Sequence, residues 1–600
     1  MKLRVIRGQV GSAIVVVLSV TVTVAVIIAV AMEYTSTIRR HVQRGEALQS
    51  AISIGDGALE SAFCYWRGIC RLSTDTPLNT IAFAAIPLPT QAQFANISGF
   101  TASATPADLT LDHPPTLSNF NVIAVDPELN SIGPLASPAP GMGQGPTSKT
   151  YYYLAQADVT LPAIKGHVTA KVRRVLEKQQ ISPWNYAIFY VDPLEIQPGA
   201  LMNVYGWVHT NGDLYTGHDL LHFLDKVTYA SDWFVGFKAG DSRAPNGSSP
   251  ETPTSPHFPA NLPPAYDVAH QPLGLDSSLI FSTLDSNPNN DSYRELLEQP
   301  NIGYPDPLQG KRYYDQAGIK ILIDSSNTIT IKDGSDTTLN ASSPNGGGQL
   351  YTIFKNAITT NQSIQDNREA SSVRLATLDI GAINNKINDG TLSAFNKIIY
   401  VADTSAGANG GTPKRGIRLK NGAIMADGGL TVASANPVYI QGDYNTGGSN
   451  PPSNSGDPTK PEVNGYARQP CAVIADAVNV LSNAWLDGNS SSDVSARDAV
   501  NTTVNTAVVA GIVPSANNNY SGGAENFLRF LEDWGGKTFT YYGSMVELYQ
   551  SRQGIGKWGS GNVYNPPTRQ WFFDNNFQFN APPGSLLVYS YIKGRWFLAQ

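Results

Sequence analysis

The segment that decides the architecture reads VGSAIVVVLSVTVTVAVIIAVAM, from Val10 to Met32, and it contains no charged residue. About 20 apolar residues suffice to cross a bilayer as a helix, and in lipid an isolated segment must satisfy its own backbone hydrogen bonds by coiling. A cleaved secretory signal would have a shorter apolar region and a small-residue cleavage site, and no clear site follows Met32. We therefore expect a transmembrane helix over residues 10–32, preceded by a short basic segment at residues 1–9.

The basic residues around this span leave its orientation nearly balanced. They lie on both sides of it, at Lys2, Arg4, Arg7, Arg39, Arg40 and Arg44. The rest of the chain is poor in charge and rich in Asn, Ser and Thr, which favours export of the C-terminal part. We expect a single-pass membrane protein with a cytoplasmic N-terminus and its bulk in the periplasm or at the cell surface.

The composition predicts a mainly β protein with more than one core. The chain has 600 residues, too many for one compact core, and 54 Gly and 40 Pro favour short strands and turns. The net charge of −7 gives no basis for nucleic-acid binding, and no basic stripe with interleaved aromatics is present.

After the span, apolar residues recur at helical spacing as far as Phe63, so residues 33–70 should continue the helix in amphipathic form. Cys64 and Cys70 are close enough to form a disulfide if the chain turns at Gly68. A continuous helix would instead place the two thiols on different faces and leave them unpaired. Cys471 is expected to be an ordinary buried thiol.

The body is expected to contain three further regions. Residues 71–180 should form a small β-rich stalk with Pro/Thr-rich loops, including a hairpin of residues 151–161 and 167–172. Residues 181–445 should form a β-helix-like body with a loop insertion near 240–310 that reads as a long surface excursion, and residues 446–600 a mixed α/β cap. In the body, residues 318–323 and 328–331 predict a second hairpin.

Two blocks of very short strands predict the architecture of the body. The first block covers residues 187–215 and the second covers residues 398–440, with strands expected at 398–401, 417–419, 423–425, 430–432 and 438–440. Strands of about three residues cannot hold an ordinary sheet alone, whereas stacked coils share one continuous core. A right-handed β-helix or a β-helix-like sandwich is expected, and an irregular antiparallel sheet is the alternative. Residues 472–485, 493–509 and 526–534 are expected to be helices.

The search for chemistry yields candidates without a convincing site. His218 and His222 have i,i+4 spacing, with His209 and Asp213 nearby, but zinc needs further ligands and the general-base Glu of the zinc-peptidase motif is absent. Residues 285–291 carry calcium-type oxygens without the Gly and Glu of an EF-hand, so a solvated turn is the stronger interpretation.

Clustered carboxylates are the other candidates, because glycosidases and lyases use pairs of them. The carboxylates Asp366 and Glu369 with the neighbouring Arg368, and likewise Glu525 with Asp533, could be mistaken for acid/base groups. No spacing shows that any pair meets in a cleft. No catalytic, cofactor-binding or metal-binding residue is therefore assigned, and no enzyme activity or cofactor is expected.

The N-terminal run Arg7-Gly8-Gln9-Val10-Gly11-Ser12-Ala13-Ile14 and the apolar stretch that follows resemble the start of PilX-type minor pilins and related pseudopilins. The resemblance implies a pilin-like helix and leader processing after Gly8 or Gly11. It also implies a Glu five residues after the processed Gly, where this chain has Ala13 or Val16. Without that carboxylate, a tip, initiating or permanently membrane-bound role fits better than repetitive polymerisation.

Several stretches of the body also look like large pilus-assembly proteins with a PilX-like N-terminus. They are residues 206–215, 429–445 and 520–527. The resemblance implies a non-enzymatic, membrane-anchored subunit for type IV pilus biogenesis or adhesion, with inner-membrane lipid, pilin-like subunits and surface polysaccharide as partners. A membrane-tethered carbohydrate-binding or carbohydrate-active β-helix protein is the alternative, and a type II secretion pseudopilus component is a third reading.

Overall fold

The computed structural model describes residues 10–72, 116–126, 128–129, 149–163, 166–199, 201–275, 277, 281–447, 468–515, 520, 522–558 and 563–599. Strands account for 36% of the chain and helices for 22%, which confirms a mainly β protein with a long N-terminal apolar helix. The chain divides into two compact units. The first contains residues 1–139, 151–178 and 591–600, and the second contains residues 140–150 and 179–590.

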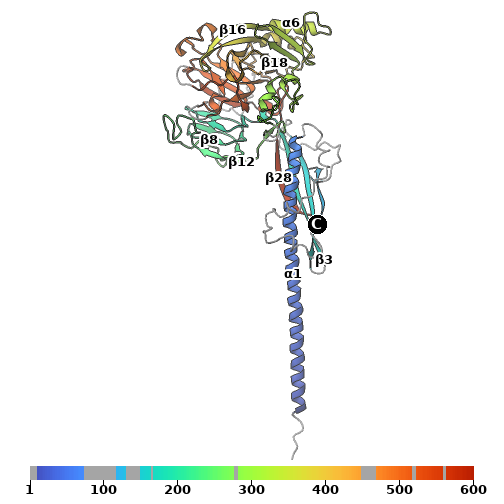
Figure 1. Ribbon diagram of the computed structural model, residues 1–600. Helices are drawn as coiled ribbons and strands as arrows, with labels where there is room; N and C mark the ends of the chain where they lie inside the picture. The colour runs from blue at the N-terminus through green and yellow to red at the C-terminus, as the bar shows by residue number, and fades with distance from the viewer. Residues whose placement is uncertain are drawn as a thin grey trace, which may run out of the picture. The chain divides into compact units, whose positions relative to one another are not determined.

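The first unit is built on α1 (Val10–Leu72), a single helix of 63 residues (Figure 1). The helix is unbroken from the apolar run through the amphipathic stretch, as the sequence predicts. Glycines at 45, 55 and 68 do not interrupt it, because the flanking residues keep the helical hydrogen bonds.

An antiparallel sheet packs on the C-terminal part of α1. Its strands β1 (Thr116–Val125), β2 (Lys149–Ala163), β3 (Gly166–Ile181) and β28 (Val588–Leu598) lie in the order β1-β2-β3-β28. The predicted hairpin of residues 151–161 and 167–172 corresponds to β2 and β3, which are neighbours in the sheet. The C-terminal strand β28 runs from Val588 to Leu598.

The second unit begins with a block of short strands, which we call its N-terminal block. They are β4 (Ile188–Tyr190), β5 (Leu194–Ile196), β6 (Met202–Val204), β7 (Val208–Thr210), β8 (Leu214–Thr216), β9 (Leu221–Phe223), β10 (Val227–Tyr229), β11 (Trp233–Val235) and β12 (Ala265–Tyr266). Every third strand returns to the same sheet in parallel: β4 pairs with β7 and β7 with β10, while β5 pairs with β8 and β8 with β11.

The middle of this unit carries two antiparallel strand pairs and three helices. Its elements are β13 (Gln271–Pro272), α5 (Tyr313–Gln316), β14 (Ile319–Ile323), β15 (Ile329–Asp333), α6 (Gly347–Ala357), β16 (Ile358–Asp366), β17 (Ser371–Asp379) and α7 (Ile380–Asn388). Strands β14 and β15 pair antiparallel from Ile319↔Asp333 to Ile323↔Ile329, which confirms the second predicted hairpin.

The C-terminal block alternates between two parallel sheets. It contains β18 (Ile398–Asp403), β19 (Lys414–Lys420), β20 (Thr431–Ala433), β21 (Val438–Gln441), β22 (Ala472–Ala475), β23 (Val478–Leu481), β24 (Thr502–Ile512), β25 (Leu528–Phe530), β26 (Thr538–Gln550) and β27 (Thr568–Phe573). One sheet has the order β26-β24-β22-β20-β18-β14, and the other β17-β19-β21-β23-β25.

Strand β26 joins the two blocks of the second unit. Its partners on one side are β27 through Thr538–Gly543 and β4 through Met545–Glu547, and on the other side it pairs with β24. The N-terminal strands therefore continue the sheet that the C-terminal strands build. A single large hydrophobic cluster contains residues from both blocks, from Ile188 to Phe573.

The three predicted C-terminal helices are wrong. Residues 472–485 form β22 and β23, residues 493–509 contain a 3₁₀ turn and most of β24, and residues 526–534 contain β25. In the part of the chain that the structure describes, no α-helix follows α7. These strands are buried on both faces, so their apolar runs lack the alternation that distinguishes a strand from a helix.

Two smaller expectations also need correction. Residues 423–425 are not a strand, and Ile424 is exposed. The region near 240–310 is not a plain surface excursion, because the 3₁₀ helix at Tyr293–Leu297 is entirely buried and packs in the second hydrophobic cluster. Residues 448–467, in the region expected to begin the mixed α/β cap, lie outside the described residues.

Candidate functional site

The N-terminal part of α1 is an exposed apolar surface with satisfied hydroxyl groups. Its best 18-residue window has a mean hydropathy of 3.0 and no buried residue, and α1 is the one helix among the described residues long and apolar enough to cross a membrane. The hydroxyls of Thr21 and Thr23 donate to the carbonyls of Val17 and Ser19, both at 2.8 Å. Because the helix satisfies these groups internally, they do not oppose transfer into lipid.

The C-terminal part of α1 is buried against the sheet by small residues and one large aromatic. Ala51, Ala58 and Ala62 are fully buried, and Gly55 brings the helix so close that an added Cβ would lie 2.4 Å from Val172 Cγ2. Trp66 packs at ring-centroid distances of 5.1 Å from Tyr153 and 5.8 Å from Tyr591. The helix is thus divided into an apolar exposed part and a docked part.

Ion pairs fix the docked part of α1 on the sheet. Arg174 of β3 contacts Asp56 at 2.9 Å and also pairs with Glu60, which accepts from Lys593 of β28 at 3.1 Å. Burial raises the pKa of Glu60, but the hydrogen bonds and charges of Lys593 and Arg174 outweigh this and hold the pKa below its usual value. These contacts orient the helix on the sheet.

The sequence candidates at the N-terminus and the cysteines are placed as follows. Gly8 lies outside the described residues, and Gly11 lies in the first turn of α1. Cys64 is exposed and Cys70 is buried, and both are free thiols because the helix continues through Gly68 and points them to different faces. The disulfide is therefore absent, and Cys471 is the buried thiol that was expected.

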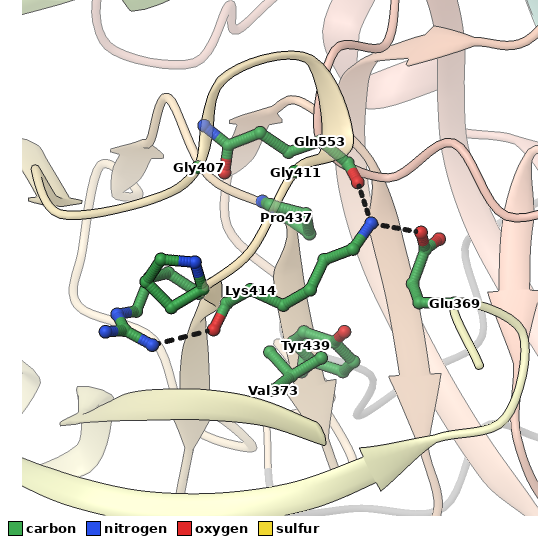
Figure 2. A pocket seen from close by; sticks show the side chains of 10 residues that line it. Glu369, Val373, Gly407, Gly411, Lys414, Pro437, Tyr439 and Gln553 are labelled. Carbon is green, nitrogen blue, oxygen red and sulfur yellow. Dashed lines mark hydrogen bonds and ion pairs between the residues drawn. The ribbon is translucent and has the colours of Figure 1, made fainter. Parts of the chain in front are cut away.

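The carboxylate of Glu369 is brought together with cations in the pocket of Figure 2. Lys414 Nζ donates to Glu369 at 2.9 Å and to the backbone carbonyl of Gln553 at 3.2 Å, so that its side chain crosses the pocket. Glu369 also pairs with Arg529 and accepts from Gly556 N at 2.9 Å.

Both oxygens of Glu369 accept hydrogen bonds. Burial raises the pKa of Glu369, but Arg529 and Lys414 outweigh burial and hold the pKa at about 2. The carboxylate of Asp366 accepts from the Tyr439 hydroxyl at 2.7 Å and from the backbone N–H of Arg368 at 2.9 Å. A carboxylate that is held ionised, as Glu369 is, is a poor proton donor or acceptor at neutral pH. The hydrogen bonds of Asp366 and Glu369 therefore brace the strands β16, β19 and β21.

The other acidic candidates do not form a pair. Glu525 is buried, and burial raises its pKa above the usual value; its oxygens accept from Gln197 N at 3.2 Å and from the Tyr520 hydroxyl at 3.3 Å. Asp533 accepts from Gly535 N at 2.9 Å within its own turn. In the 285–291 loop, Asp285 accepts from Asn287 N at 2.9 Å, the solvated turn that the sequence favours.

The histidines are arranged differently from the sequence expectation. His218 Nδ1 accepts from Leu220 N at 3.2 Å, and His222 pairs with His257 at a ring-centroid distance of 4.4 Å. His209 lies instead with Asp267 and His270, and the three residues could hold a metal ion. Burial and the neighbouring His270 keep the pKa of His209 well below its usual value.

Sequence reasoning missed Asp267 and His270. They are 58 and 61 residues beyond His209, counted from these positions, in a stretch assigned to a loop excursion. Their only local signal is the Asp-x-x-His spacing, which is too common to identify a site by itself.

Comparison with protein-family models, with curated proteins and with solved structures finds no match to this chain.

Proposed function

We propose that the chain is a non-enzymatic, membrane-anchored subunit of a type IV pilus or of its assembly machinery, with a minor-pilin-like N-terminal part. The observation that carries the proposal is the division of α1: its first part is apolar and exposed, and its last part docks on an antiparallel sheet. A helix of this kind serves both as a lipid anchor and as a surface for the corresponding helices of other subunits.

The N-terminus would be cytoplasmic and the bulk periplasmic or at the cell surface. Arg39, Arg40 and Arg44 follow the span, so charge alone does not set this orientation. The many Asn, Ser and Thr residues and the low charge content of the body support export.

The body would be a β-solenoid that presents a large surface outside the cytoplasm. Support comes from the parallel return of every third strand in β4–β12 and from the two sheets that β18–β27 build alternately. Such coils share one core, so strands of three residues are stable only in the stack.

The chain would occupy a tip, an initiating position or the membrane itself. The position of the family carboxylate is taken by Ala13 or Val16, and neither can neutralise the N-terminal amine of a neighbouring subunit in an apolar filament core. Substitution Ala13→Glu would therefore increase copurification with pilin-like subunits if Gly8 is the processed residue, whereas Val16→Glu would do so if Gly11 is.

The anchoring step is tested by matched arginine substitutions on the exposed surface of α1. Val24→Arg places a charge in the apolar run at a cost of about 2.5–3.5 kcal/mol for insertion. Val42→Arg places the same side chain on the same helix beyond the run, at a residue that is 53% exposed against 48% for Val24. Alkaline carbonate extraction should release the Val24 variant and leave both the native chain and the Val42 variant in the membrane.

N-terminal sequencing of the membrane-bound chain tests the pilin part of the proposal separately. A new terminus at Gln9 or Ser12 supports processing after Gly8 or Gly11, and an intact Met1 supports a simple signal anchor. Release of the native chain by carbonate would contradict anchoring itself.

A carbohydrate-binding role is the second candidate, because aromatic rings stack on the 3-stranded sheet of the second unit. Tyr215 of β8 and Phe234 of β11 are adjacent in register, with ring centroids 5.0 Å apart and planes at 17°. Phe234 is 43% exposed, and Lys238 lies 5.9 Å from the Tyr215 ring. Substitution Phe234→Ala should abolish retention on a polysaccharide column, and equal retention of the native and variant chains would exclude this surface.

A further inference from the structure

Three side chains of the second unit converge, one from β7 and two from a segment about 60 residues later in the chain. His209 lies at the centre of β7, Asp267 follows β12 directly, and His270 precedes β13. Parallel pairing of β7 with β10 and of β10 with β12 places these segments side by side. One potential ligand atom of each residue lies within 4.8 Å of those of the other two.

His270 is the unusual member of this cluster. Its side chain is only 3% exposed, and neither ring nitrogen has a hydrogen-bond partner within the described residues. The nearest carboxylate oxygen, Asp267 Oδ2, lies 3.8 Å from Nε2, beyond hydrogen-bonding distance. A buried polar group without a partner is destabilising, and an additional ligand at this position would remove that cost.

His209 is oriented by second-layer hydrogen bonds of the kind that metal-binding histidines have. Its Nε2 lies 3.0 Å from Asn211 Oδ1, which can only accept, so the proton is on Nε2 and the lone pair is on Nδ1. Nδ1 lies 2.8 Å from the Thr228 hydroxyl, which has a second acceptor in the Val208 carbonyl at 3.3 Å. The hydroxyl can therefore release Nδ1 without losing its own hydrogen bond.

Asn211 also fixes the backbone of His270, and thus ties the two histidines together. Its Oδ1 accepts from His270 N and its Nδ2 donates to His270 O, both at 2.7 Å. The imidazole rings of His209 and His270 have centroids 4.2 Å apart. Partners in this outer layer hold the ligand side chains in position before any ion arrives.

Aromatic rings enclose the cluster. Phe189 stacks on His209 with centroids 5.7 Å apart, and Tyr186 meets His270 edge-on at 5.9 Å. Asp267 is the partly exposed member, so it provides the way in. An enclosed site with two imidazoles and one carboxylate has the ligand chemistry of Zn²⁺ rather than of Ca²⁺ or Mg²⁺, which prefer oxygen ligands.

We propose that His209, Asp267 and His270 bind one divalent transition-metal ion of the zinc class, with a water molecule in the fourth position. Zn–N distances of about 2.0–2.1 Å put tetrahedral ligand atoms about 3.4 Å apart, so the ion would draw the three atoms together. The ion joins the end of the β4–β12 block to the segment that follows it. Its role is structural, and it does not depend on the proposed function.

The test uses the full-length chain in detergent, stripped with a chelator and titrated with Zn²⁺ or Co²⁺ alone. Metal content after dialysis should be one ion per chain, thermal unfolding of the second unit should shift upwards, and bound Co²⁺ should give the visible absorption of a tetrahedral site. His270→Asn should remove the bound ion and the absorption. Asn211→Ala should weaken binding about 10- to 100-fold, because it removes only the outer-layer support.

His257→Asn is the matched control, since His257 and His222 form the other close histidine pair of the unit. This variant should keep the ion. Loss of binding in His257→Asn with retention in His270→Asn would move the site to that pair and overturn the proposal. Absence of a stoichiometric ion in the native chain would also overturn it. Far-UV circular dichroism checks folding, and if His270→Asn misfolds, Asp267→Asn, which is partly exposed, gives the same readout.

Discussion

Substitution Gly55→Ala tests whether a close approach of backbone to side chain sets the docking of α1 on its sheet. A Cβ at this position would lie 2.4 Å from Val172 Cγ2, 3.1 Å from Val172 Cβ and 3.5 Å from Val159 Cγ2. A Cβ carbon essentially never lies under 3.0 Å from another heavy atom, so the helix or Val172 must move. An alanine is otherwise the better residue in a helix interior.

Two opposing effects determine how much Gly55→Ala changes the stability of the docked helix. Replacement of an interior glycine by alanine gains about 1 kcal/mol of helix propensity, whereas overpacking a well-filled core costs about 1–3 kcal/mol. At Gly68, on the same docked part of α1, an added Cβ meets nothing within 4 Å, so Gly68→Ala should show the gain alone. The two variants should therefore differ by about 1–3 kcal/mol, with Gly55→Ala the less stable.

Hydrogen–deuterium exchange of the full-length chain in detergent measures this difference locally, because amides of residues 51–62 report opening of the docked helix and not unfolding of the second unit. Combining Gly55→Ala with Val172→Ala should restore part of the lost protection, since the smaller side chain removes the clash. Equal protection in Gly55→Ala and Gly68→Ala would refute the reasoning, because it would mean that the helix has room at Gly55.

Three further outcomes follow from buried groups. Trp66→Ala should destabilise the first unit by about 3–5 kcal/mol, while Tyr65→Ala, at an exposed neighbouring position, should change it little; exchange of the helix amides distinguishes them. Burial raises the pKa of Glu532 to about 7, from its usual 4.5. Between these pH values the folded chain therefore binds more protons than the unfolded chain, so the free energy of unfolding falls as pH rises. The slope is about 1.4 kcal/mol for each pH unit, which gives a total loss of about 3 kcal/mol across this window. Glu532→Gln should remove this pH dependence of stability. The assignment would be contradicted if the denaturant midpoint changed by the same amount between pH 5 and pH 8 in the native chain and in the variant. Glu369→Gln should cost about 3–5 kcal/mol at pH 7, because two buried cations lose their carboxylate; an unchanged denaturant midpoint would contradict the bracing role.

The sequence predicts α1 and the two hairpins because their signals are local. An uninterrupted apolar run needs no tertiary information, and the hairpin of β14 and β15 alternates Ile residues around a short polar turn. The short strands of the N-terminal block are also predicted, since turn residues separate them at regular intervals.

The C-terminal strands are mistaken for helices for a physical reason. All four residues of β22 and of β23 are buried, and ten of the eleven residues of β24 are buried. A strand covered on both faces has apolar residues at every position, so its sequence carries no two-residue period. The length of the segment between turns is then the only local signal, and for segments as short as β22 and β23 it does not distinguish a strand from a turn of helix.

The site residues divide in the same way. Glu369 is visible as a charged residue, but its partner Arg529 is 160 positions away and is brought to it by stacking of β-strands. His270 and Asp267 carry no pattern of their own. Their proximity to His209 depends on the register of β7, β10 and β12, which pairing across the sheet determines and the local sequence does not.

The pairing of β4 with β26 has a consequence for how the chain reaches its native state. Val191, just after β4, donates to the backbone carbonyl and the side chain of Glu547, a residue 356 positions later in the chain. During synthesis, the edge of β4 that pairs with β26 therefore stays unpaired until almost the whole polypeptide has emerged, although the other edge can pair with β7 early. Contacts of such long sequence separation form slowly, and an open parallel edge invites pairing with other nascent chains. A truncation within the last sixty or so residues (roughly the stretch from β26 onward) would consequently disrupt structure near the start of the body.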